Sequence, residues 1–387
     1  MEILSDVVNA LVCFLGVIIA LRIRIIPIWI GYILSIYSFL PFFLNDFLFP
    51  ATYMSDQFLY TSTLEQVRSL NYFNHEIVNP KSLYTAWILS ILPIPFVETV
   101  KSMGFYNRFL FLIIFLWLYN KNFLSGMTLS FILFYPSLVL YTSLSLREPT
   151  TLFLMILGII FFIDKKYFCS FIVIIPLNYI KYQNFLLMII SYAVLFIYRK
   201  KTVAYKYRYL LIIFLIPTLF FVIVTLSIFS LKNYQLSLNL SENLLLLNKI
   251  RSSFYFQNFG NVDLYQSISS FQNLVSSSIT APIYFLIKPF PWEANNLFQI
   301  IQSLENIIVL IFLIVFTKKA FNQDSFITSR WLFLFTISMT LYGLVVFNYG
   351  TASRYKFTFI VIYVVGVSYE LYKIYGYRFG KIFKIKF

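Results

Sequence analysis

Long apolar runs separated by short polar or charged segments form the main pattern of the chain. A helix needs roughly 17–25 mostly apolar residues to cross a bilayer, and many of these runs approach that length. The pattern predicts membrane helices over residues 7–21, 25–44, 109–119, 123–142, 151–163, 167–178, 185–197, 209–229, 297–316, 331–346 and 357–374. We therefore predict an all-α polytopic membrane protein that forms a single integral membrane domain over residues 1–387.

Composition supports this class. The 387 residues are 60% hydrophobic and 12% charged, whereas a soluble domain carries roughly 25% charged residues. The net charge of +15 is explained by the crowding of Lys and Arg into cytoplasmic loops. Nucleic acid is excluded as a partner, because the pattern leaves no soluble basic domain to bind it.

The basic clusters set the expected topology. They lie at residues 22–24, 165–166, 199–208, 318–319 and 373–386, and we place all of them in the cytoplasm. This works if Ser82–Val100, which contains Pro93 and Pro95, is an interfacial or re-entrant elbow. The result is about eleven crossings with the N-terminus outside. If the elbow crosses instead, Lys165 and Lys166 fall outside.

Two external segments follow from this topology. Residues 45–106 form a first segment with an interfacial or re-entrant helix, and residues 230–295 form a large loop. Within that loop the apolar spacing predicts an amphipathic helix along the membrane surface, with a second one starting near residues 244–247. They are either a lid or a passive cap. The helical spacing is carried by Leu264, Tyr265, Ile268, Phe271, Leu274 and Val275.

Four polar segments interrupt the apolar pattern, around Asp56, Arg147, residues 288–293 and residues 347–356. We expect all four on the external side of the membrane, where Lys and Arg are normally scarce. Cations there favour an anionic substrate, since an arginine fork donates two hydrogen bonds to phosphate. The alternative is that they anchor helices at the interface. The candidate diphosphate- or glycan-binding residues are Arg147, Arg354, Lys356, Lys288, Arg251, Trp292 and Tyr355.

Four acids accompany these cations. Asp56 is a candidate general base toward a sugar hydroxyl, or otherwise a solvated loop acid, and Glu293 beside Trp292 is the second candidate base. Glu148 either orients Arg147 toward phosphate or complements the helix dipole beside Pro149. Glu305 lies inside a predicted membrane helix and is either functional or a buried ionic partner. The sequence therefore gives Asp56, Glu293 and Glu148 as candidate catalytic residues.

Several site types are absent from the sequence. Two cysteines and one histidine match no metal-ligand spacing, and there is no Walker A, G-x-G-x-x-G or H-E-x-x-H motif. We expect neither a metal nor a cofactor. Without a cytoplasmic catalytic domain for a nucleotide sugar, any glycosyl donor is expected to be lipid-linked and to be reached from outside.

These stretches resemble the Wzy-type polysaccharide polymerases of bacterial O-antigen, capsule and exopolysaccharide pathways. The layout is also similar to the GT-C-type, polyprenyl-dependent membrane glycosyltransferases, although Ser55 and Gln57 flank Asp56 where that group has two adjacent acids. The resemblance is carried by Asp56 with Tyr60, Ser143-Leu144-Ser145-Leu146-Arg147-Glu148, residues 289–293 with Glu305, and residues 348–355.

The resemblance implies a polymerase at the periplasmic face of the bacterial inner membrane. It would transfer a growing glycan onto a new repeat unit linked to undecaprenyl diphosphate, with arginines holding the diphosphates. Its implied partners are the lipid-linked oligosaccharide, membrane lipid and a chain-length regulator protein. Three alternatives remain: a single-sugar GT-C transferase, an O-antigen ligase, and a non-enzymatic flippase or transporter of lipid-linked oligosaccharides.

Overall fold

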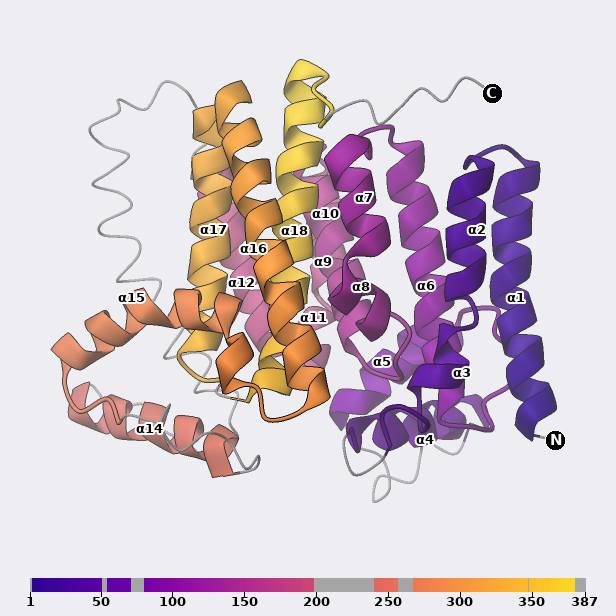
Figure 1. Ribbon diagram of the computed structural model, residues 1–387, viewed down its shortest axis with the longest axis horizontal. Helices are drawn as coiled ribbons and strands as arrows, with labels where there is room; N and C mark the ends of the chain where they lie inside the picture. The colour runs from indigo at the N-terminus through magenta and orange to yellow at the C-terminus, as the bar shows by residue number, and fades with distance from the viewer. Residues whose placement is uncertain are drawn as a thin grey trace. The chain divides into compact units, whose positions relative to one another are not determined.

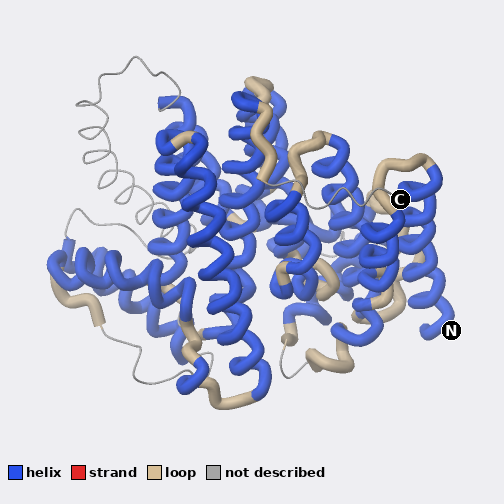
Figure 2. The backbone as a smooth tube through the Cα atoms, turned by 45° about the horizontal axis from the view of Figure 1, so that its top comes forward, coloured by secondary structure: helices blue, strands red, loops and turns tan. Residues whose placement is uncertain are grey.

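The computed structural model describes residues 2–50, 54–70, 80–197, 240–256, 267–346 and 348–379. This part of the chain is helical, without a named strand (Figures 1 and 2). Within it, four helices are long and apolar enough to cross a bilayer: α1 (Glu2–Arg22), α6 (Lys101–Asn120), α16 (Leu297–Gln323) and α18 (Tyr349–Tyr375). The prediction of a helical membrane protein is confirmed at this level. The predicted span at 209–229 and the basic cluster at 199–208 lie outside the described residues.

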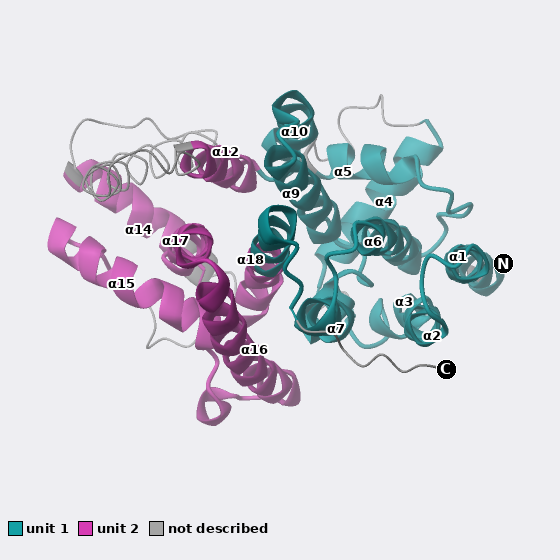
Figure 3. Cartoon of the chain, turned by 90° about the horizontal axis from the view of Figure 1, so that it is seen from above, with its two compact units in different colours: residues 1–181, 364–387 teal, residues 182–363 magenta. Residues whose placement is uncertain are grey.

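The chain divides into two compact units (Figure 3). The single integral membrane domain stays a prediction. Unit 1 contains residues 1–181 and 364–387, and unit 2 contains residues 182–363. The second boundary falls inside α18, so one helix contributes to both units.

Unit 1 is built around α6, which packs against α1, α3, α4, α5 and α9. Its other helices are shorter than α1 and α6. They are α2 (Ile28–Tyr37), α3 (Leu40–Leu44), α4 (Asp56–Arg68), α5 (Pro80–Ser90), α7 (Gly126–Phe134), α8 (Pro136–Tyr141), α9 (Glu148–Ile163), α10 (Tyr167–Ile174) and α11 (Leu177–Ile180).

Three predicted spans in unit 1 are each divided into two helices. The run over 25–44 breaks between Tyr37 and Leu40, and the runs over 123–142 and 167–178 break at Pro136 and Pro176. Proline lacks an N–H and clashes with the preceding turn, so an apolar run containing it ends one helix and begins another. The predicted elbow over 82–100 is helical only to Ser90.

Charged contacts mark two ends of unit 1. At one end, where α1 and α6 both begin, Asp6 lies 3.8 Å from Lys101. At the other end the Asp164 carboxylate meets Lys121 at 3.4 Å and Lys373 at 3.0 Å. The basic turns that follow α1 and α9 are found at this second end (Figure 1). Acidic side chains therefore hold lysines at both ends of unit 1.

Unit 2 contains α12 (Tyr182–Ile197), α14 (Leu240–Phe256), α15 (Phe271–Ile287), the short 3₁₀ helix η2 (Pro291–Glu293), α16, α17 (Ser325–Gly343) and the first part of α18. Helix α15 begins where Ser270 accepts a hydrogen bond from the Asn273 N–H, so the predicted amphipathic helix starts later than residue 264. It packs closely on α17, since a Cβ on Gly343 would lie 2.5 Å from the Ala281 oxygen. Leu264 and Tyr265 lie outside the described residues.

Candidate functional site

A cavity of about 540 Å³ lies in unit 2 between α14, α15 and the adjoining ends of α17 and α18. Its charged lining residues are Arg251 and Lys288, and no carboxylate lines it in the described part of the chain. Hydroxyl groups come from Ser276, Ser277 and Thr280 on α15, and the phenols of Tyr284 and Tyr349 complete the polar wall. Two cations beside hydroxyl groups suit an anionic ligand that carries further polar groups.

Arg251 reaches this cavity from α14. Its guanidinium is buried, and Nη1 donates to the Leu344 carbonyl at 2.7 Å. Leu244 and Leu247 belong to the same apolar cluster as Leu344, which seats α14 on the unit. One turn before Arg251, the Asn248 side chain both donates to and accepts from the Ile268 backbone at 2.9 Å. The Arg251 guanidinium is therefore held in one orientation.

Lys288 lies directly after α15 and pairs with Glu293. The Lys288 Nζ is 2.9 Å from the Glu293 carboxylate, which also accepts from the Phe290 N–H at 3.0 Å. Burial would raise the pKa of Glu293, but the hydrogen bonds from Lys288 and Phe290 outweigh it and hold the pKa below its ordinary value. Glu293 thus remains ionised at neutral pH and keeps Lys288 oriented.

Lys356 is a buried residue of α18 and does not line the cavity. Its Nζ donates to Asn306 Oδ1 at 2.6 Å and to the Leu286 carbonyl at 3.2 Å, and Glu305 attracts its charge. The Asn306 amide donates to the Ile287 and Lys288 carbonyls at 3.0 and 2.9 Å. The last carbonyls of α15, which have no partner inside the helix, are therefore capped from α16 and α18.

In unit 1 the predicted Arg147 starts α9 and is held in place by two contacts. Its Nη1 donates to the Ile180 carbonyl at 3.0 Å, and its guanidinium carbon lies 5.9 Å from the Tyr60 ring centre. Asp56 lies one helical turn before Tyr60 on α4, so both residues share a helix face. Glu148 is fully buried, with Lys181 Nζ 3.9 Å away. Such a buried pair favours a structural role for Glu148.

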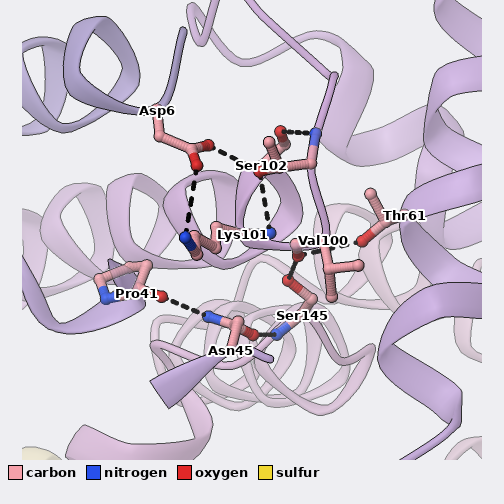
Figure 4. Close-up of polar contacts among 9 residues, drawn as sticks. Asp6, Pro41, Asn45, Thr61, Val100, Lys101, Ser102 and Ser145 are labelled. Carbon is pink, nitrogen blue, oxygen red and sulfur yellow. Dashed lines mark hydrogen bonds and ion pairs between the residues drawn. The ribbon is translucent and has the colours of Figure 1, made fainter. Parts of the chain in front are cut away.

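Buried polar groups fix the loop that precedes Arg147 (Figure 4). Asn45 donates to the Pro41 and Ser143 carbonyls at 3.1 and 2.8 Å and accepts from the Ser145 N–H at 2.8 Å. The Ser145 hydroxyl donates to the Val100 carbonyl, which also accepts from Thr61. The loop is therefore tied to the end of α3 and to the start of α6, which fixes the backbone from which Arg147 projects.

The remaining candidates are not gathered at the cavity. Trp292 is 78% exposed and stacks on Phe290 with ring centres 4.8 Å apart. Tyr355 packs edge-on against Tyr342, and Arg354 is half-buried on α18. Of the predicted cations in unit 2, the structure brings Arg251 and Lys288 together.

Sequence reasoning missed two residues that the structure makes prominent. Asn306 is a neutral amide inside an apolar run and gives no periodic signal. Arg108 is buried within α6, where the apolar pattern alone started the span at Phe109. The signal for both is a polar residue inside a helix that is long enough to span a membrane.

Among the described residues, no three His, Cys, Asp or Glu side chains lie close enough together to hold a metal ion. Comparison of the chain with protein-family models, with curated proteins and with solved structures finds no match.

Proposed function

We propose that the protein is a membrane glycosyltransferase that polymerises oligosaccharide repeat units carried on undecaprenyl diphosphate, at the external face of the bacterial inner membrane. The observation that supports it most is the cavity of unit 2, which combines two cations with hydroxyl and phenol groups and is walled by helices of a membrane protein. The proposal includes the GT-C-like layout and the predicted topology of about eleven crossings.

In this reaction an acceptor hydroxyl attacks the anomeric carbon of the donor glycan. The new carbon–oxygen bond forms as the bond to the diphosphate breaks, and the diphosphate leaves with the electron pair. Arg251 and Lys288 are positioned to neutralise this developing charge, because both are fixed by short contacts before any ligand arrives.

The hydroxyl proton passes to a carboxylate. Glu293 contacts the cavity residue Lys288, but its lowered pKa makes it a weak base, and this contact favours an orienting role. Asp56 of unit 1 stays the other candidate base that the sequence suggests. Replacing each acid by its amide tests it as the base, because loss of the base lowers kcat and a variant that keeps kcat excludes that acid.

The test is deletion of the gene in its host and complementation with wild type, Arg251→Gln, Lys288→Met or the control Lys318→Met, with surface glycan separated on a gel. Lys318 is an exposed lysine near the opposite end of α16. We expect the deletion to collapse the ladder to a single repeat unit, and wild type and Lys318→Met alone to restore it. Loss of all surface glycan would indicate a ligase, a flippase or an earlier step. An unchanged ladder would refute the proposal.

A further inference from the structure

One face of α15 is apolar and exposed over the whole length of the helix. Phe271, Val275, Ile279 and Ile283 recur every four residues with exposed fractions of 61, 44, 66 and 53%. The opposite face, with Leu274, Ala281 and Phe285, is buried. No charged residue occurs between Phe271 and Ile287. In water such a face would be unfavourable, so it needs an apolar neighbour.

This apolar face adjoins the cavity. Ser276 and Thr280 line the cavity, and both adjoin the apolar face. Ser276 lies three residues before Ile279 and Thr280 three residues before Ile283, a spacing that makes side chains neighbours on a helix surface. Tyr284 belongs to both surfaces: it lines the cavity, is 51% exposed, and its ring centre lies 5.0 Å from the Lys288 Nζ. A continuous surface therefore leads from a cationic, hydroxyl-lined cavity onto an uncharged apolar helix face.

We propose that this α15 face binds the hydrocarbon chain of the lipid whose phosphate groups enter the cavity. The charge pattern indicates the occupant: the cations require an anionic head, the apolar face requires hydrocarbon, and both are parts of one surface. The inference rests on the proposed function, and it adds the place where the hydrocarbon chain of the lipid carrier binds. The protein then selects carriers by their chain as well as by their phosphates.

The experiment uses the full chain in nanodiscs and two probes, inorganic pyrophosphate and farnesyl diphosphate. The first has the charged head alone, and the second adds a 15-carbon isoprenoid. Binding is measured for wild type, Ile279→Ser, Ile283→Ser and the control Ile308→Ser. Ile308 is a matched control because it lies on α16, away from the cavity lining, and is also 66% exposed.

We expect wild type to bind farnesyl diphosphate at least about tenfold more tightly than pyrophosphate, as contact with several apolar carbons implies. Ile279→Ser and Ile283→Ser should each weaken farnesyl diphosphate binding by about tenfold and leave pyrophosphate binding unchanged. Ile308→Ser should change neither.

Three results would overturn the proposal in different ways. Tighter binding of farnesyl diphosphate that survives both α15 substitutions would place the chain elsewhere, while the proposed function stands. Equal losses in Ile279→Ser and Ile308→Ser would mean that bulk lipid alone covers α15. If neither probe binds to wild type, the cavity does not hold a diphosphate, and both this inference and the proposed function fall.

Discussion

Asn306→Ala tests the capping of α15 from inside unit 2. The substitution removes one hydrogen bond from the Lys356 ammonium at 2.6 Å and two bonds to the Ile287 and Lys288 carbonyls. A neutral hydrogen bond contributes about 1 kcal/mol and one to a charged group about 1.5–3 kcal/mol. We therefore expect Asn306→Ala to lower the free energy of unfolding by about 4 kcal/mol.

The assay is titration of the full chain in mixed micelles with a denaturing detergent, followed by tryptophan fluorescence. Gln302→Ala is the matched control, since Gln302 lies on the same helix and donates one hydrogen bond, to the Tyr349 carbonyl at 2.8 Å. Its expected cost is about 1 kcal/mol. Similar costs for the two variants would refute the reasoning.

A double-mutant cycle with Lys356→Met isolates the contact between the two side chains. Each single variant already loses the contact between Lys356 and Asn306. The double variant should therefore lower the free energy of unfolding by about 1–3 kcal/mol less than the sum of the two single variants. Strict additivity would mean that the contact contributes no stability, and would reopen Lys356 as a ligand-binding cation.

Two further predictions concern unit 1. Burial would raise the pKa of Asp164, but hydrogen bonds from Tyr369 and Lys373 and the charge of Lys121 hold it below its ordinary value of 3.8. Asp164→Asn should therefore lower the free energy of unfolding by about 2 kcal/mol at neutral pH, and this difference from wild type should disappear as pH falls through the lowered pKa. A difference that stays constant with pH in unfolding titrations would contradict this. Arg147→Lys should keep part of the polymer ladder, because it keeps the positive charge. Arg147→Glu should abolish the ladder, because reversing the charge adds a second carboxylate beside Glu148. Normal ladders from both variants would exclude a role of Arg147 in phosphate binding.

The apolar pattern predicted the helical class and the positions of the long apolar helices α1, α6, α16 and α18, because burial in a bilayer needs long apolar runs whatever the tertiary structure. It gave no helix at α4. It predicted helix breaks less well. Pro136 and Pro176 each divide a run that was predicted as one span, and the backbone rule for proline would have placed both breaks.

The candidate site was predictable in part, and the limit has a physical origin. Arg251 and Lys288 were selected because cations are scarce in external loops, and the structure places both at one cavity. Lys356 was selected by the same reasoning and is instead buried, with Asn306 and the Leu286 carbonyl as acceptors. The sequence shows where a charge lies along the chain but not which backbone carbonyls it will meet.

Arg108 provides the sharpest test of whether a buried intramembrane charge is structural. Its Nη1 donates to the Thr142 hydroxyl at 2.8 Å and the Ser143 hydroxyl at 3.4 Å, and its guanidinium lies over the rings of Tyr37 and Phe111 at 4.7 Å. No carboxylate pairs with it among the described residues, and Nη2 has no hydrogen-bond partner there.

Both hydroxyls already donate to backbone carbonyls, at 2.6 Å from Thr142 to Leu138 and 2.9 Å from Ser143 to Val139, so removing Arg108 leaves no unpaired donor behind. A charge at membrane depth costs about 2.5–3.5 kcal/mol, and hydrogen bonds from a charged group return about 1.5–3 kcal/mol each, so for Arg108 the two contributions nearly cancel. We therefore expect Arg108→Met to change the unfolding free energy by less than about 2 kcal/mol. A loss above about 2 kcal/mol would mean that an anion compensates the charge. If Arg108→Met keeps its stability but loses the polymer ladder, Arg108 is a functional cation rather than a structural one.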